Sequence, residues 1–185
     1  MNYGLIIAFL VLVVIQWVVN GKIIWDKSEV LKKGQPYKFK TEPVDPTNPF
    51  KGKYITLTFS ESIFADTINR NLVSNDNIYL LLGIDQRGYA FVKNLSKQEP
   101  KNDKAYVKAT VYYTATDNDS ISVHIRYPFD EFYMDEYKAP KAEIIYREST
   151  RDTSNKTYAL VKIWKGEGVI ENVFINDIPI RELIK

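Results

Sequence analysis

The chain begins with an unbroken apolar run. Residues Tyr3 to Val19 read YGLIIAFLVLVVIQWVV and contain no charged side chain. A helix that crosses the hydrocarbon core of a bilayer needs roughly 17–25 such residues. Lys22 can extend its ammonium group into the headgroup zone, and Trp17 and Trp25 are of the type that anchors helices at membrane interfaces. The pattern predicts a single transmembrane anchor over residues 1–25.

A cleaved signal peptide and a buried core helix are the alternatives to an anchor. A signal peptide has a basic segment before its apolar run and small residues at a cleavage site after it. Here the only positive group before the run is the α-amino group, and no such cleavage site follows. We therefore expect an uncleaved anchor. The lysines after the run favour a cytoplasmic domain, but the length of the domain that follows weakens this rule.

Alternation of apolar and polar residues predicts β-strands after the anchor. Residues 26–40 are expected to form a tether and a first strand, in which Tyr37 and Phe39 alternate with lysines. Ile55, Leu57 and Phe59 also alternate with polar residues, as in a half-buried strand. Further strands are predicted at 77–84, 89–93, 106–114, 120–127, 157–164, 169–175 and 178–180, with hairpin turns at 85–88, 115–119 and 165–168.

One segment, residues 128–146, is rich in acids and aromatic rings and does not alternate. Its end, Ala139 to Arg147, has helical spacing with Pro140 in the first turn, which predicts a short inserted helix. The fold class is therefore mostly β: one N-terminal transmembrane helix, followed by an antiparallel β-barrel or sandwich-like domain over residues 41–185.

Composition excludes several kinds of site. The chain has no cysteine, which removes disulfides, thiolate metal sites and a cysteine nucleophile. His124 is the only histidine, so no histidine-rich metal site can form. The net charge of +2 comes from interspersed basic and acidic residues and does not favour nucleic-acid binding. We expect no metal, no cofactor and no catalytic residue.

The least ordinary stretch is Thr41 to Phe59, TEPVDPTNPFKGKYITLTF. Residues before prolines are held extended, so the stretch should be a stiff loop that leads into a strand. It resembles the motif of the GDYXXLXY family of bacterial membrane-anchored proteins, and most of the chain has counterparts there. The residues at the motif and structural positions here are Pro43, Asp45, Pro46, Gly52, Tyr54, Leu57 and Phe59.

Two positions depart from that family's motif. Lys53 stands where the motif has an acid, and Phe59 stands where it has a tyrosine. No function that needs a carboxylate or a hydroxyl at these positions is possible here. What is left are residues that shape a turn and a strand, and Asp45 is expected to accept hydrogen bonds from loop amides rather than bind a ligand.

The resemblance implies a location and a partner but no chemistry. It implies a single-pass protein of the bacterial inner membrane whose soluble domain lies on the extracytoplasmic side, with the cytoplasmic side as the alternative. Members of the family are uncharacterised and are often encoded beside polytopic membrane proteins, which points to another membrane protein as partner.

The function that we expect is a membrane-anchored, non-enzymatic β domain that binds a protein partner as an accessory subunit. Four aromatic residues in and just before the segment 128–146 are the candidate contact surface. The other interpretation is that they belong to a loop that caps the fold. These residues are Tyr127, Phe129, Phe132 and Tyr133. The same rings would serve the alternative function, binding of an envelope glycan or lipid. A Ser–Lys hydrolase built on Ser60 or Ser62 is a further alternative.

Overall fold

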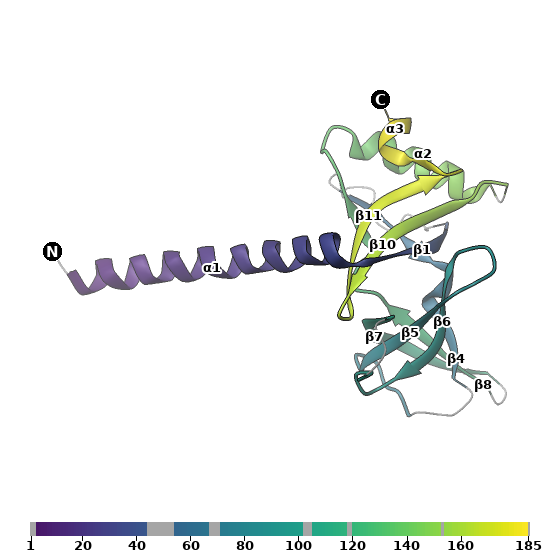
Figure 1. The fold of residues 1–185 in the computed structure, drawn as a ribbon, viewed down its shortest axis with the longest axis horizontal. Helices are drawn as coiled ribbons and strands as arrows, with labels where there is room; N and C mark the ends of the chain where they lie inside the picture. The colour runs from purple at the N-terminus through teal and green to yellow at the C-terminus, as the bar shows by residue number, and fades with distance from the viewer. Residues whose placement is uncertain are drawn as a thin grey trace.

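The computed structural model describes residues 3–43, 54–66, 71–101, 105–117, 120–152 and 154–184. A long helix, α1 (Tyr3–Lys33), projects from a β-rich domain (Figure 1). The helix is longer than predicted, because residues 26–33 are helical rather than part of a tether. Ion pairs four residues apart, Lys22–Asp26 and Glu29–Lys33, favour helix in this polar segment.

The other predicted strands are present, but the strand predicted from Tyr54 to Phe59 is divided in two, and the strands Ile63–Asp66 and Glu131–Tyr133 were not predicted. The strands are β1 (Gln35–Glu42), β2 (Tyr54–Thr56), β3 (Thr58–Phe59), β4 (Ile63–Asp66), β5 (Asn77–Ile84), β6 (Ala90–Ser96), β7 (Tyr106–Asp117), β8 (Ser120–Arg126), β9 (Glu131–Tyr133), β10 (Thr157–Trp164), β11 (Glu167–Ile175) and β12 (Ile178–Pro179). The shorter helices are a 3-10 turn (Ser60–Ser62), α2 (Ala139–Arg151) and α3 (Ile180–Leu183).

The described strands form two five-stranded sheets and a separate pair. One sheet has the order β12-β11-β10-β1-β3, the other has the order β4-β8-β7-β5-β6, and β2 pairs with β9. Every pairing is antiparallel. Isolated bridges Lys38–Tyr89 and Val107–Gly166 connect the two sheets, so the predicted barrel-like antiparallel fold is confirmed. Helices α2 and α3 lie at the end of the domain that carries β10 and β11 (Figure 1).

An aromatic cluster of four rings joins the two sheets. Its members are Phe39, Phe59, Tyr127 and Phe129. The centroids of every pair lie between 5.2 and 5.7 Å apart, a spacing at which aromatic pairs attract. The hydroxyl of Tyr127 donates to the carbonyl oxygen of Glu61 at 2.8 Å, so its polar end is satisfied inside the core. This cluster is the centre of the fold.

The prediction of an aromatic contact surface is therefore wrong for three of its four residues. Tyr127, Phe129 and Phe132 are at most 5% exposed. They are buried because the chain after β8 turns inward over Phe39 and then pairs as β9 with β2. Tyr133 is 62% exposed and keeps a position at the surface. The first strand after α1 matches its prediction, since Tyr37 and Phe39 are buried.

Candidate membrane anchor and partner-binding surface

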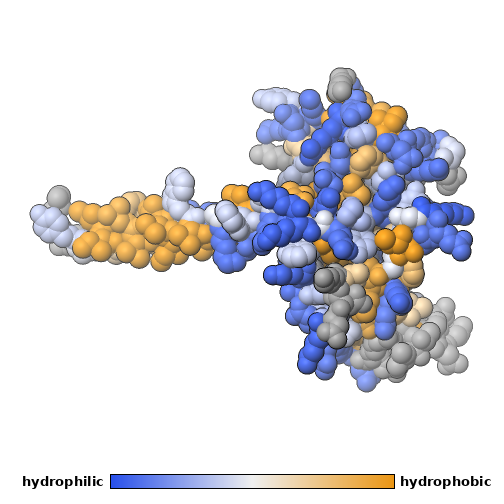
Figure 2. Space-filling view, viewed as in Figure 1, coloured by the Kyte–Doolittle hydropathy of each residue, from blue (hydrophilic) through white to orange (hydrophobic). Residues whose placement is uncertain are grey.

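The apolar part of α1 packs against nothing in the described structure. The helix is long and apolar enough to cross a membrane, and none of the 18 residues in its apolar window is buried. Trp17 is 77% exposed and Trp25 is 74% exposed. In Figure 2 the apolar surface covers the outer part of α1 and gives way to polar surface where the helix meets the β domain. An apolar patch of this extent on a monomer marks a surface that another phase or partner covers.

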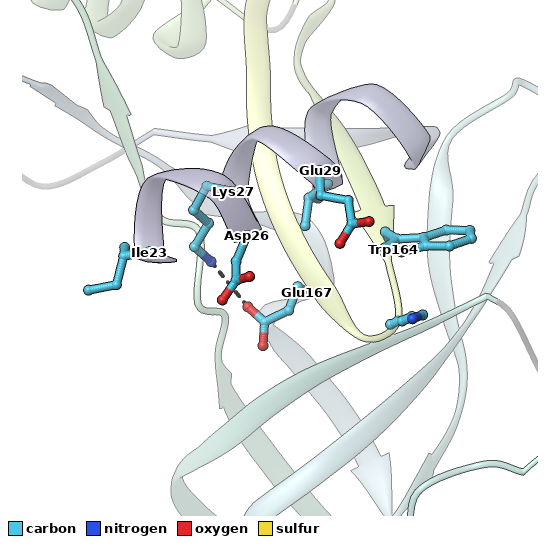
Figure 3. A pocket seen from close by; sticks show the side chains of 8 residues that line it. Ile23, Asp26, Lys27, Glu29, Trp164 and Glu167 are labelled. Atoms are coloured by element: carbon cyan, nitrogen blue, oxygen red, sulfur yellow. Dashed lines mark hydrogen bonds and ion pairs between the residues drawn. The ribbon is translucent and has the colours of Figure 1, made fainter. Parts of the chain in front are cut away.

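The last turns of α1 attach to the hairpin formed by β10 and β11. Val30 is 4% exposed, and it is the helix's buried residue at this junction. The ammonium group of Lys27 lies 3.1 Å from the carboxylate of Glu167 on β11 (Figure 3). Since both side chains are about half exposed, this ion pair stabilises the junction by only roughly 0–1 kcal/mol. The burial of Val30 contributes more to the stability of the junction.

A pocket of about 320 Å³ lies at this junction (Figure 3). Its walls are Ile23, Asp26, Lys27, Glu29, Val30, Trp164, Lys165 and Glu167. The helix provides the first five and the β10–β11 hairpin provides the last three. The indole N–H of Trp164 is enclosed and has no acceptor among the described residues. We refer to this cavity as the junction pocket.

The hairpin tip that borders the junction pocket has a defined shape. Lys165 and Gly166 have φ angles of 51° and 81°, as in the two-residue turn that suits the twist of antiparallel strands. Gly166 lies so close to β7 that an added Cβ would come within 2.6 Å of the Tyr106 ring. Its carbonyl oxygen accepts a hydrogen bond from the Lys108 N–H at 2.8 Å. The tip is therefore held in place by β7.

The family motif has a structural role where the structure describes it. Leu57 and Phe59 are 3% and 2% exposed, and the N–H of Leu57 donates to the Asp130 carbonyl oxygen at 2.8 Å. Tyr54 is half-buried, with its ring 5.3 Å from that of Tyr133. Pro43 is exposed. The predictions for Asp45, Pro46 and Gly52 lie outside the described residues.

A second group of aromatic side chains is exposed on β7 and β8. A β-bulge interrupts their pairing, since Val111 pairs with Ile125 while Tyr113 pairs with His124. The extra residue leaves both Tyr112 and Tyr113 on the surface, 53% and 44% exposed. Bulges of this kind re-aim side chains and are frequent beside functional sites.

The exposed rings are ordered by contacts with one another. Tyr113 stacks on His124 with centroids 3.9 Å apart and planes inclined by 15°. The guanidinium carbon of Arg126 lies 4.5 Å from the centroid of Tyr112. A groove of about 400 Å³ runs from these residues to the motif strands at Thr56 and Thr58. We call Tyr112, Tyr113, His124 and Arg126 the tyrosine surface.

Sequence reasoning missed the tyrosine surface. The pair Tyr112-Tyr113 places two large side chains at consecutive positions of an otherwise alternating strand. Such a break in alternation is the sequence pattern of a bulge. It could have indicated two outward rings, but not that His124 and Arg126 would lie beneath them.

The hydroxyl groups of the two candidate serines have different surroundings. The Ser62 hydroxyl donates to the carbonyl oxygen of Phe59 at 2.6 Å, and the enclosed Ser60 hydroxyl has no hydrogen-bond partner. Neither serine is therefore paired with a lysine in the part of the chain that the structure describes. Within the same part, no group of three or more acidic or histidine side chains could hold a metal ion.

Comparison with known families accounts for most of the chain. The family model described as GDYXXLXY protein matches residues 16–173. Neither a curated protein nor a solved structure matches the chain. The match covers the end of α1, the motif strands, the aromatic cluster and the β10–β11 hairpin. The chain therefore belongs to the GDYXXLXY family.

Proposed function

We propose that this protein is a membrane-anchored, non-enzymatic β domain that binds another membrane protein as an accessory subunit. The observation that carries the proposal is the apolar stretch of α1, which has no buried residue in its apolar window and belongs to one continuous helix that ends at the β domain. A lipid bilayer would remove this surface from water, at a gain of about 25 cal/mol per Å² buried.

The tyrosine surface is the contact site that the proposal assigns to the partner. Tyrosine and arginine are among the residue types enriched at the hot spots of protein interfaces, and tyrosine brings a large contact area at low entropic cost. Here the four side chains already hold one another in place through the Tyr113–His124 stack and the Arg126–Tyr112 contact. Little conformational entropy would therefore be lost when a partner covers them.

The location follows from the same proposal. The protein would be a single-pass protein of the bacterial inner membrane with its β domain on the extracytoplasmic side. The positively charged residues after the span favour the opposite side, but a long translocated domain tolerates them. A reporter enzyme fused after Lys185 distinguishes the two sides.

The test uses the tagged full-length protein in its native membrane. We expect it to stay in the membrane fraction after a carbonate wash and, after gentle detergent extraction, to co-purify with a stoichiometric membrane protein. The double variant Tyr112→Ala/Tyr113→Ala should lower partner recovery at least tenfold while the protein remains in the membrane.

The control is Tyr137→Ala, which removes a ring that is 93% exposed and lies outside the tyrosine surface. It should recover the partner at the wild-type level. A monomeric extract without a stoichiometric partner would overturn the assignment of an accessory subunit. Partner recovery that is unchanged in the double variant would overturn the assignment of the tyrosine surface.

A further inference from the structure

The junction pocket lies at the depth of lipid headgroups if α1 crosses the membrane. A helix rises about 1.5 Å per residue, so about 20 residues cross the roughly 30 Å hydrocarbon core. Counted from Tyr3, where α1 begins, the core ends near Lys22. The headgroup zone adds about 5–8 Å, which at that rise extends it to about Lys27. The helical wall of the junction pocket, Ile23 to Val30, covers this zone.

The end of the pocket toward the bilayer is apolar, and the charged side chains lie further along α1. Ile23 is 55% exposed and lies at that end, before Asp26, Lys27 and Glu167 (Figure 3). Trp164 lies at the opposite end of the pocket, beyond Glu29 (Figure 3). A molecule in this pocket therefore meets hydrocarbon at one end and charge at the other, which is the form of a phospholipid.

One lysine of the pocket, Lys165, has no ion pair within the described residues, although its charge acts on Glu29. Each carboxylate has a lysine partner: Asp26 pairs with Lys22, Glu29 with Lys33, and Glu167 with Lys27. The pKa of Glu29 is lowered, first by its hydrogen bond from Lys33 and then by the charge of that lysine, so this carboxylate is ionised at neutral pH. The ammonium group of Lys165 lies 5.8 Å from the centroid of the Trp164 ring.

The pocket carries both signs of charge close together. Three carboxylates and two ammonium groups line it, and the lysines that pair with Asp26 and Glu29 are not part of this lining. Carboxylates therefore outnumber ammonium groups on the walls themselves, which disfavours an anionic headgroup without an amine. A zwitterionic headgroup with a primary amine matches both signs. Its phosphate can accept a hydrogen bond from Lys165, and its ammonium group can donate to the Glu29 or Glu167 carboxylate.

We propose that the junction pocket binds one phospholipid with a phosphoethanolamine headgroup. Its phosphate lies at Lys165, its amine lies toward the acidic wall, and its acyl chains run past Ile23 along α1. The volume of about 320 Å³ falls at the lower end of the range for small-molecule sites, roughly 300–1,000 Å³. The proposal rests on the proposed function, since it requires α1 to cross the membrane.

Native mass spectrometry of the full-length protein, released from nanodiscs of defined composition, tests this proposal. Phosphatidylethanolamine should be retained as a one-to-one adduct in preference to phosphatidylglycerol, which lacks the amine. It should also be preferred over phosphatidylcholine, whose quaternary nitrogen cannot donate a hydrogen bond. Equal retention of all three lipids would overturn the proposal.

The variant Lys165→Asn removes the ammonium group and keeps a residue type that tolerates the positive φ of this turn. We expect about a tenfold loss of the adduct, the size expected for one charge-assisted hydrogen bond. Lys93→Asn, at an exposed lysine on β6, is the control and should retain the adduct.

Unchanged retention of the lipid adduct in Lys165→Asn would exclude Lys165 as the phosphate-binding residue. Failure of the full-length chain to enter nanodiscs would contradict the anchor itself, whereas insertion without lipid preference would contradict only the lipid site.

Discussion

Ser60 carries a hydroxyl group whose surroundings do not satisfy it. The oxygen is enclosed and unpartnered within the described structure, and an unmade hydrogen bond of this kind costs about 1–3 kcal/mol. Ser60→Ala should therefore keep or raise the free energy of unfolding, by up to about 1 kcal/mol, as measured by urea denaturation in detergent.

Ser62 is the matched comparison for this prediction. Its hydroxyl donates to the Phe59 carbonyl oxygen at 2.6 Å, so Ser62→Ala should lower the free energy of unfolding by about 1 kcal/mol. A larger loss in Ser60→Ala than in Ser62→Ala would mean that Ser60 has a partner or role in solution. Such a result would favour the alternative in which Ser60 belongs to a Ser–Lys hydrolase site.

Two buried tyrosines make the fold sensitive to alkali. Burial, with a hydrogen bond to Glu99, raises the pKa of Tyr106 to about 12, and burial, with a hydrogen bond to Asp177, raises that of Tyr158 to about 12. In the unfolded chain both ionise near the ordinary value of 10.0. Their contribution to stability is therefore full below pH 10 and is lost as the pH rises through 12.

We expect the free energy of unfolding to fall between about pH 10 and pH 12, as followed by circular dichroism during denaturant titration. Tyr158→Phe should make this fall less steep, because the phenylalanine cannot ionise in either state. Tyr137→Phe, at a ring that is 93% exposed, should leave the slope unchanged. Identical slopes for Tyr158→Phe and the wild type would show that Tyr158 is not buried in its protonated form.

At the scale of elements, β11 approaches the aromatic cluster most closely at Gly168. A Cβ added there would lie 2.3 Å from the Phe129 ring, and that ring is fixed by its three neighbours in the cluster. Gly168→Ala should therefore lower the free energy of unfolding by about 1–3 kcal/mol, the usual cost of overpacking a core. Gly21→Ala is the control, since an added Cβ meets nothing within 4 Å there. A midpoint of thermal unfolding that is unchanged in Gly168→Ala would contradict this packing.

Elements with a strong local pattern could be predicted closely, and those defined by distant contacts could not. The strands at 77–84 and 157–164 match β5 and β10, because both are apolar stretches bounded by turn residues. The extension of α1 to Lys33 was missed, because it depends in part on the packing of the end of α1, where Val30 is buried, against β10 and β11. The burial of Tyr127 and Phe129 was missed for the same reason, since Phe39 is some 90 residues away in the sequence.

At the scale of the molecule, the candidate sites lie where separate segments meet. The long apolar helix could be predicted because its length and apolarity are visible in the local sequence. The junction pocket could not, because it needs α1 and the β10–β11 hairpin side by side. The tyrosine surface likewise requires the register that puts Tyr113 opposite His124. Local sequence specifies neither pairing.

The attachment of α1 through Val30 should hold the β domain at a defined orientation to the membrane. Because the chain has no cysteine, spin labels can be placed only where wanted, at Lys32→Cys on α1 and Gln86→Cys on the exposed β5–β6 turn. In nanodiscs, double electron–electron resonance should give one narrow distance distribution.

The variant Val30→Asp should broaden this distance distribution, because an ionised carboxylate cannot stay in that buried position. Lys22→Ala, which loses only an ion pair within the helix, should leave it narrow. A broad distribution in the otherwise unchanged protein would mean that the domain rotates freely on its anchor, and the junction pocket would then not persist as a site.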